Sequence, residues 1–197
     1  QATFPGRKML EFQGVSSGPL YERIRGNLLD LDGDDHRRLR KLVQPAFTPP
    51  AADKHRPAMR EQLEQLWQTI EADGACDFVD AVAKPFPARI IATVMGAPLE
   101  DAPRLHAWAN RIQQQFDPIK VATELPELER AATEFEEYAR ELVRAREDNP
   151  ADDLITELIR AEHEGDTLSE DECLSLISAV LVGGVDTTQA QLAHGIR

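Results

Sequence analysis

Hydrophobic side chains recur at helical spacing along most of this 197-residue chain. They lie three or four positions apart, which places them on one face of a helix with 3.6 residues per turn. No stretch shows the alternation of apolar and polar residues that a half-buried strand requires. The pattern therefore predicts an all-α assembly of about eight helices. The main ones are expected at residues 35–43, 49–73, 77–84, 89–95, 105–116, 124–146, 154–159 and from 170 onward.

Prolines, glycines and chain length set the expected domain organisation. Pro85 and Pro87 are expected to interrupt one helix, which resumes at residue 89. Residues 1–27 contain four glycines and are expected to be loop-rich, with one short helix near residues 21–25. Residues 28–197 are expected to be helical. A chain of this length can bury one core, so we expect a single domain.

The most hydrophobic stretch, residues 174–185, is expected to be the central element of the fold. Ser169 and Glu172 form the Ser-x-x-Glu pattern of a capping box, which predicts one long helix starting there and entering the core. The apolar stretch is shorter than the ~20 residues needed to span a bilayer, so we do not expect it to cross a membrane.

Two glycines, an acid and a hydroxyl interrupt this helix. Each glycine costs about 1 kcal/mol relative to alanine, so Gly183 and Gly184 suggest that a flat body packs against bare backbone. Thr187 lies four positions after Gly183 and can bond its carbonyl, which would open a polar notch beside Asp186 in a dry interior. This notch suggests proton delivery. The alternative is a core helix with a glycine kink whose aspartate pairs with a basic side chain.

A second candidate site lies on the predicted helix at residues 35–43. His36 and Arg40 are four positions apart, so they project from one face and can bind two neighbouring carboxylates. Arg37, Arg38 and Lys41 form a basic outer face. The alternative is a solvated basic helix that balances the acids before it.

Charge and cysteine content exclude some classes of function. The formal net charge of −13 argues against nucleic acid or an anionic membrane as a partner. Cys76 and Cys173 have no metal-ligand spacing, so we expect free, buried thiols and a cytoplasmic protein. The chain starts at Gln1 without a secretory leader, and its last helix is still running at Arg197. We therefore expect it to be incomplete at both ends.

Several segments together resemble a bacterial cytochrome P450, a haem-thiolate monooxygenase, from about Asn27 to the last residue. Residues 32–40 (Asp-Gly-Asp-Asp-His-Arg-Arg-Leu-Arg), followed by Pro-Ala-Phe-Thr at 45–48, look like the C-helix of that family. Residues 181–188 (Leu-Val-Gly-Gly-Val-Asp-Thr-Thr) look like the oxygen-activating part of its I-helix. Residues 152–172 resemble the approach to the I-helix.

The resemblance implies a haem b cofactor, O2 as co-substrate, a small apolar organic substrate, and a ferredoxin or flavoprotein as electron donor. By role, the residues that it assigns are His36, Arg40, Gly183 and Gly184 for the cofactor, Asp186 and Thr187 for catalysis, Ala179, Val182 and Gly183 for the substrate, and Arg37, Arg38 and Lys41 for docking of the electron donor.

This sequence also departs from the family pattern. The thiolate ligand of the family lies in a glycine-rich loop after the I-helix, and neither Cys76 nor Cys173 sits in such a loop. The Glu-x-x-Arg motif of the family is likewise not found after the I-helix. The chain therefore looks like the middle of such an enzyme, inactive alone and without an axial metal ligand. The alternative from another class is a non-catalytic helical fragment or interaction module without a cofactor.

Overall fold

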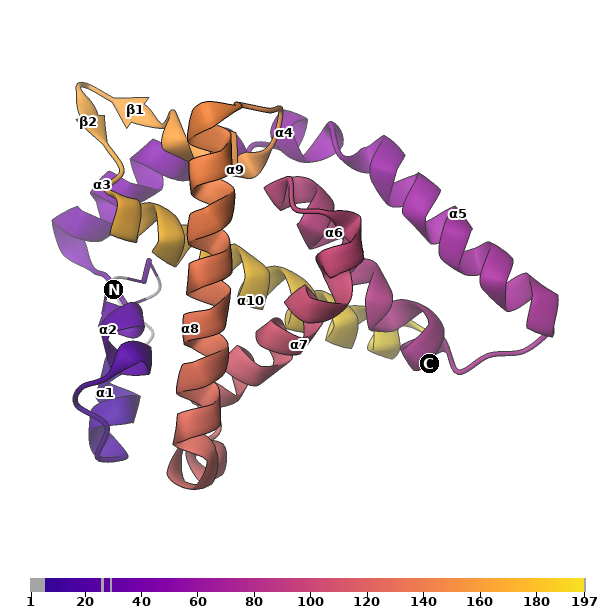
Figure 1. Cartoon of the computed structure of the whole chain (residues 1–197), viewed down its shortest axis with the longest axis horizontal. Helices are drawn as coiled ribbons and strands as arrows, with labels where there is room; N and C mark the ends of the chain where they lie inside the picture. The colour runs from indigo at the N-terminus through magenta and orange to yellow at the C-terminus, as the bar shows by residue number, and fades with distance from the viewer. Residues whose placement is uncertain (1–5, 26, 29, 197) are drawn as a thin grey trace.

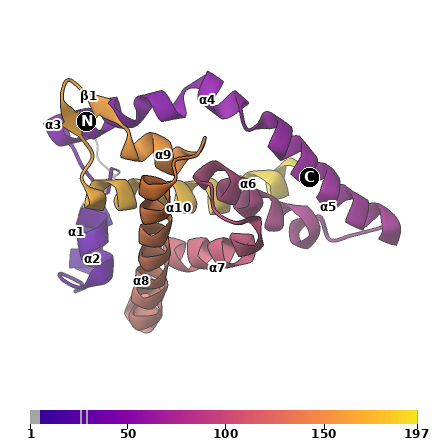
Figure 2. The same ribbon diagram turned by 45° about the horizontal axis from the view of Figure 1, so that its top comes forward.

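The computed structural model of this protein describes residues 6–25, 27–28 and 30–196, and most of these residues are helical (Figure 1). The long helix α10 (Glu170–Gly195) runs through the middle of the molecule, and α8 (Pro118–Asp148) crosses it (Figures 1 and 2). The other helices are α1 (Gly6–Phe12), α2 (Pro19–Arg25), α3 (Gly33–Val43), α4 (Pro49–Asp53), α5 (Arg56–Asp73), α6 (Pro85–Met95), α7 (Ala102–Gln113) and α9 (Leu154–Ile159).

Short connecting elements complete the described part of the chain. Turns of 3-10 helix lie at Gln44–Phe47, Leu99–Asp101 and Gln114–Phe116, and a π-helical turn lies at Val79–Ala83. Between α9 and α10, strands β1 (Glu162–His163) and β2 (Asp166–Thr167) form a small antiparallel hairpin. The all-α fold class is thereby confirmed.

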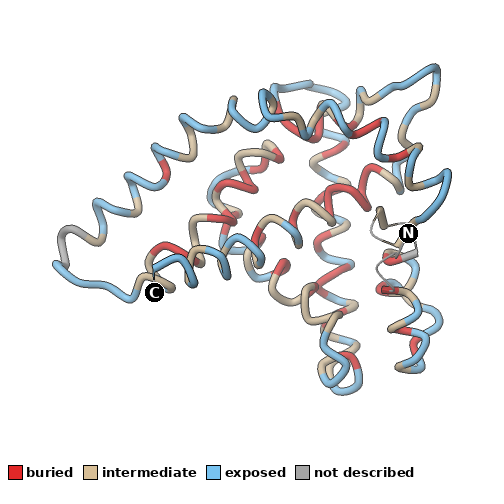
Figure 3. The backbone as a smooth tube through the Cα atoms, turned by 180° about the vertical axis from the view of Figure 1, so that it is seen from behind, coloured by how far each residue is buried: buried red, intermediate tan, exposed pale blue. Residues whose placement is uncertain are grey.

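The main core forms where α6, α7, α8 and α10 meet. Ile177, Leu181 and Val185 on α10 are completely buried. They belong to the same cluster as Leu105 on α7 and Phe135 on α8. Buried residues concentrate at these crossings, whereas α5 is mostly exposed (Figure 3). The stretch that is most hydrophobic in the sequence is therefore the central core helix, as predicted.

A smaller core joins the two N-terminal helices to the first half of α8. Leu10 of α1 and Leu20 and Ile24 of α2 pack with Val121 and Leu128 of α8. Figure 2 shows α1 and α2 side by side next to α8. The predicted helix near residues 21–25 is thus present, but α1 is an additional helix in a region expected to be irregular. Its contacts are with distant residues, which local sequence does not reveal.

Capping residues start α4, α9 and α10, and one of these caps, the capping box at Ser169, was predicted from the sequence. The Thr48 hydroxyl accepts a hydrogen bond from the Ala51 N–H, and Asp153 caps α9 by accepting one from the Thr156 N–H. Ser169 and Glu172 form both hydrogen bonds of the capping box at the start of α10. Such caps satisfy N–H groups that have no partner within the helix.

Several local expectations are wrong. The predicted helix at 49–73 is broken into α4 and α5, and the apolar stripe of α5 is not buried, because Leu63 and Trp67 are exposed. Pro85 starts α6 rather than interrupting a helix, since proline is tolerated in the first turn, where its missing N–H would have no helical acceptor. The hairpin β1–β2 forms although no stretch of the sequence shows the alternation expected of a strand.

Arg146, near the end of α8, joins three elements. Its Nε forms an ion pair with the buried carboxylate of Asp153, and its Nη2 donates to the Gly96 carbonyl at 2.6 Å. Gly96 ends α6 with φ of +75°, and a Cβ there would lie 2.6 Å from Asp153 Cγ. This junction fixes the end of α6 and the start of α9 against α8.

The whole helix α10 is long and apolar enough to cross a membrane, although its most hydrophobic stretch, residues 174–185, is too short to do so by itself. The helix nevertheless packs against α6, α7 and α8 of its own chain. A buried central helix of a globular protein has the same composition as a membrane span, so this feature describes a core helix.

Candidate functional site

A cavity of about 350 Å³ lies beside the middle of α10. Ala179, Val182, Gly183 and Thr187 all line it. Apolar side chains of Ile24, Ile112 and Phe116 close other sides of the cavity, from α2, α7 and the turn that follows α7. The structure therefore brings together the three residues assigned to the substrate and one of the two assigned to catalysis.

Helical periodicity explains why these residues share a face. Leu181 and Val185 point into the core, which leaves Gly183 and Thr187 on the other side of α10. The Thr187 hydroxyl donates a hydrogen bond to the Gly183 carbonyl, as the sequence predicts. However, Gly183 and Thr187 are exposed rather than set in a dry interior, so the notch opens onto the surface of this chain.

The two glycines of α10 have different surroundings. A Cβ on Gly184 would lie 2.9 Å from Cγ1 of Ile91 and even closer to Cδ1 of the same side chain. The absence of a side chain at Gly184 therefore lets α6 pack closely against α10. A Cβ on Gly183 would meet no atom within 4 Å. That both glycines contact the cofactor stays a prediction. Gly184 serves helix packing, and Gly183 presents open backbone to the cavity.

We expect Gly184→Ala to destabilise the fold by about 1–3 kcal/mol, because the new methyl group overpacks the contact with Ile91. Gly183→Ala should be neutral or stabilising by up to about 1 kcal/mol, because alanine favours the helix and has space there. Urea denaturation of both variants measures the difference. Ile91→Val should restore part of the stability of Gly184→Ala, and equal losses in the two single variants would contradict this assignment.

Asp186 lies on a different side of α10 from Thr187, toward α7. Burial raises the pKa of the Asp186 carboxyl, and the nearby His106 opposes this shift. Nε2 of His106 lies 3.0 Å from Oε1 of Gln189, and the Asn110 side-chain N–H donates to the His106 carbonyl at 2.9 Å. Asp186 thus belongs to a polar cluster at the interface of α7 and α10.

Sequence reasoning missed His106, Asn110 and Gln189. The only available signal was weak: His106 and Asn110 are four positions apart on a predicted helix. Which face of that helix meets α10 depends on packing between elements far apart in the sequence.

His36 and Arg40 lie on α3, at the end of α10 where the hairpin β1–β2 also lies (Figure 1). Neither residue lines the cavity beside Thr187. His36 is half-buried and Arg40 is exposed. Within the described parts of the chain, neither forms an ion pair with an acidic side chain. Both remain available to bind carboxylates of another molecule.

Arg38 departs from the predicted basic outer face. It donates from Nε to Asp166 and from Nη1 to Glu172, each at 2.6 Å, and so joins α3 to the hairpin and to the first turn of α10. Hydrogen bonding to Arg38 lowers the pKa of Asp166. Burial acts to raise the pKa of Glu172, but the hydrogen bonds from Arg38 and Ser169 lower it overall. Arg37 pairs with Asp34 of its own helix and is exposed, as is Lys41.

The two cysteines lie in different surroundings. Cys173 is buried in the core, and burial first, then Glu147 and Glu170, raise the pKa of its thiol to about 11. Cys76 is free but exposed, so the expectation of two buried thiols is wrong for this residue. Neither cysteine lines the cavity beside Thr187.

The sequence and the helical fold have counterparts in known proteins. The sequence matches the family described as Cytochrome P450 over residues 12–196. This chain belongs to the cytochrome P450 family. A steroid C26-monooxygenase of Mycolicibacterium smegmatis is 34% identical over 174 residues, which cover 87% of this chain and 40% of that protein. The mycinamicin IV hydroxylase/epoxidase of Micromonospora griseorubida is 35% identical over 173 residues, or 87% of this chain and 42% of that protein.

Solved P450 structures share the fold. CalO2 superposes with a TM-score of 0.86 and 26% identity, covering 96% of this chain and 47% of that chain. P450BioI, in a complex with an acyl carrier protein ligated to hexadec-9Z-enoic acid, superposes with a TM-score of 0.84 and 26% identity. The match covers 90% of this chain and 46% of that chain. This chain spans less than half the length of these relatives.

The residues present fit the haem that this family implies, apart from the axial ligand. Open backbone at Gly183, beside the exposed Thr187, lets a flat molecule approach α10. His36 and Arg40 are basic groups that suit the two carboxylates of a haem. Cys173 is in the core with a raised pKa, so it does not supply the thiolate that iron ligation needs.

Proposed function

We propose that the complete protein is a haem-dependent monooxygenase that inserts one atom of O2 into an apolar organic substrate. The observation that carries this proposal is that Ala179, Val182, Gly183 and Thr187 line the same cavity. Family membership and the monooxygenase and hydroxylase names of the relatives support it. Haem, held at its carboxylates by His36 and Arg40, supplies the redox-active iron that O2 chemistry requires.

The residues of this chain bind the substrate and deliver protons. Insertion of one oxygen atom into a C–H bond releases the other as water, which consumes two protons and two electrons. Ala179 and Val182 hold an apolar substrate and exclude water from it. The Thr187 proton is already donated to the Gly183 carbonyl, so its oxygen lone pairs are free to accept a hydrogen bond from a water molecule and hold it in place.

Asp186 replenishes these protons. Its raised pKa brings the carboxyl closer to the pH at which it can both take up and release a proton. His106, which is close enough to influence the Asp186 carboxyl and contacts Gln189, is the group that would pass protons to it. The electrons come from a ferredoxin or flavoprotein, which docks on the exposed Arg37 and Lys41. Arg38 has no part in docking, because it is bound to Asp166 and Glu172. The free thiols fit a cytoplasmic location.

Isotope labelling tests the function directly. The complete protein, supplied with a ferredoxin, its reductase and ¹⁸O2, should place one labelled atom in the product and one in water. Product that carries oxygen from solvent would exclude monooxygenation.

We expect the 197-residue chain alone to be inactive, because neither cysteine is placed to ligate iron. Haem added to this chain and reduced under carbon monoxide should give no spectrum of thiolate ligation, whereas the complete protein should give one. A thiolate spectrum from the chain alone would mean that Cys76 or Cys173 serves as the ligand. Cys76→Ser and Cys173→Ser would then identify which.

A further inference from the structure

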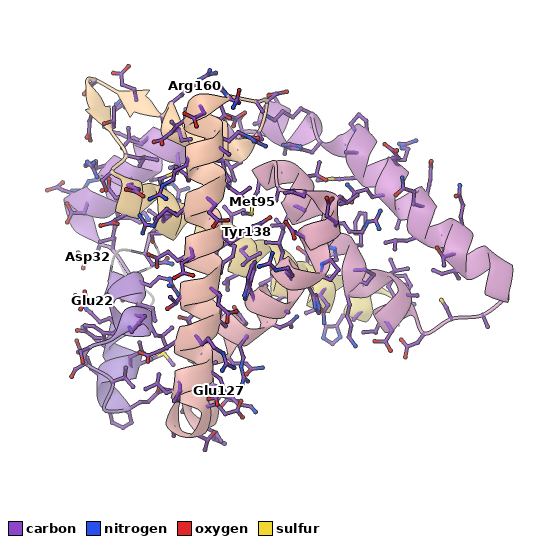
Figure 4. The ribbon with its side chains drawn as sticks, in the orientation of Figure 1. Glu22, Asp32, Met95, Glu127, Tyr138 and Arg160 are labelled. Carbon is purple, nitrogen blue, oxygen red and sulfur yellow. The ribbon has the colours of Figure 1, made fainter. Side chains whose placement is uncertain are left out.

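Arg23 on α2 lies at the boundary between two cavities. It lines the cavity beside Thr187 and also a second cavity of about 550 Å³. Ser178 of α10 lines both as well, so the two spaces adjoin at these residues. Figure 4 labels Glu22, the neighbour of Arg23 on α2, which lines the second cavity.

The guanidinium of Arg23 is buried but incompletely bonded. Its side chain is only 8% exposed. Nη2 donates to Oε2 of Glu136 at 2.8 Å, while the buried Nη1 has no acceptor within the described residues. Arginine stays charged at all relevant pH values, so this group cannot lose its proton to escape the cost of burial. Buried N–H groups are nearly always satisfied, and Nη1 therefore calls for an acceptor from outside the chain.

The charges around the two cavities decide on which side that acceptor binds. The second cavity presents the carboxylates of Glu22, Glu136, Asp171 and Glu172, which repel another anion. The cavity beside Thr187 presents one carboxylate, Asp30. Asp30 accepts a hydrogen bond from the Arg7 N–H at 3.1 Å, and its other oxygen lies 3.7 Å from the Arg7 guanidinium. An anion is therefore better accommodated beside Thr187.

The rest of that cavity suits an apolar molecule. Ile24, Ile112, Phe116 and Val182 line it. The amide of Gln113 also lines it, and its oxygen is buried without a donor. A side-chain amide can turn to present its NH₂ group, which would add a second donor.

We propose that the substrate is an apolar carboxylic acid whose carboxylate binds Arg23 and whose hydrocarbon body lies along Ala179 and Val182. The oxidation of this acid rests on the proposed function, but its binding does not. Because the head group is held at α2, the carbons presented to Thr187 are remote from the carboxylate. Arg23 thus determines both the class of substrate and the position that is oxidised.

A matched pair of probes tests the binding. Decanoate and decan-1-ol share a hydrocarbon chain and differ in charge, and calorimetric titration of the 197-residue chain at neutral pH compares them below their aggregation limits. The parent should bind decanoate more tightly. Arg23→Gln should weaken decanoate binding by about 10- to 100-fold, the loss expected for a charge-assisted hydrogen bond, and change decan-1-ol binding by less than about threefold.

Two variants control for the ion-pair network around Arg23. Arg140 shares Glu136 with Arg23 but lines neither cavity, so Arg140→Gln should bind decanoate like the parent. Glu136→Gln removes the carboxylate that competes for Arg23, so decanoate should bind at least as tightly.

Several outcomes would overturn the proposal: no preference for decanoate in the parent, an equal loss of both probes in a folded Arg23→Gln, or weaker decanoate binding in Glu136→Gln. If Arg23→Gln does not fold by circular dichroism, Arg23→Lys takes its place. A folded Arg23→Lys without any preference for the acid also contradicts the proposal. These measurements need no haem, so a protein that binds acids through Arg23 and yields no labelled product would refute only the proposed function.

Discussion

Asp186→Asn in the complete enzyme should slow turnover by about 10²- to 10⁴-fold with unchanged substrate affinity, because positioned acid–base groups typically contribute this much. Asparagine keeps the shape of the side chain but cannot take up and release a proton. Asp186 does not line the substrate cavity, which is why binding should be unaffected. The measurement is the turnover number and the substrate dissociation constant of parent and variant.

The same substitution should stabilise the fold at neutral pH. Burial raises the pKa of Asp186 above its ordinary value of 3.8, so the folded chain holds this proton more tightly than the unfolded chain. Stability is therefore lost as the pH rises from the ordinary value through the raised one. Asp186→Asn removes this loss, and its advantage should disappear below about pH 3.8. A loss of activity together with a loss of stability at neutral pH would mean that the carboxylate is structural.

Thr187→Ala should affect the fate of oxygen rather than the speed of its consumption. Without the hydroxyl, water is no longer held beside Gly183, and protons reach the wrong atom. Oxygen should still be consumed but appear as hydrogen peroxide instead of product. Thr187→Ser keeps the hydroxyl and should stay coupled. Asp171→Asn, an exposed acid in the first turn of the same helix, should leave turnover unchanged. Tight coupling in Thr187→Ala would contradict its assigned role.

Arg146→Met should destabilise the fold by about 3–5 kcal/mol, the cost typical of leaving one partner of a buried ion pair uncompensated. Asp153 is almost fully buried, with its side chain 5% exposed, and Arg146 is the basic group that pairs with it. The Gly96 carbonyl would lose its donor as well. Urea denaturation of the chain measures the loss.

A matched variant on the same helix controls for the loss of a charge. Arg130 is exposed and lies 3.9 Å from Glu134, so Arg130→Met should cost less than about 1 kcal/mol. Adding Asp153→Asn to Arg146→Met should recover part of the stability, because the unpaired charge is removed. If Arg146→Met and Arg130→Met cost the same, the junction of α6, α8 and α9 does not depend on this ion pair.

Features that depend on residues one or two turns apart could be predicted from the sequence. Ser169, Thr48 and Asp153 each cap a helix by accepting a hydrogen bond from the backbone N–H three positions later. The hydrogen bond from Thr187 to the Gly183 carbonyl joins residues one helical turn apart. The apolar spacing likewise fixed the helical class and identified α10 as the core helix, because burial of one face follows directly from the helical period.

Features that depend on which helix faces which were decided only by the tertiary structure. Arg38 lies on a basic face in the sequence, yet it binds Asp166 and Glu172 from a segment far along the chain. Ile91 of α6 leaves no room for a side chain at position 184, and the buried Arg23 of α2 pairs with Glu136 of α8. Helical spacing states which side chains share a face, but the neighbour of that face is set by packing between distant segments. The sequence therefore predicted a candidate site on α10, and the fold determined which residues surround it.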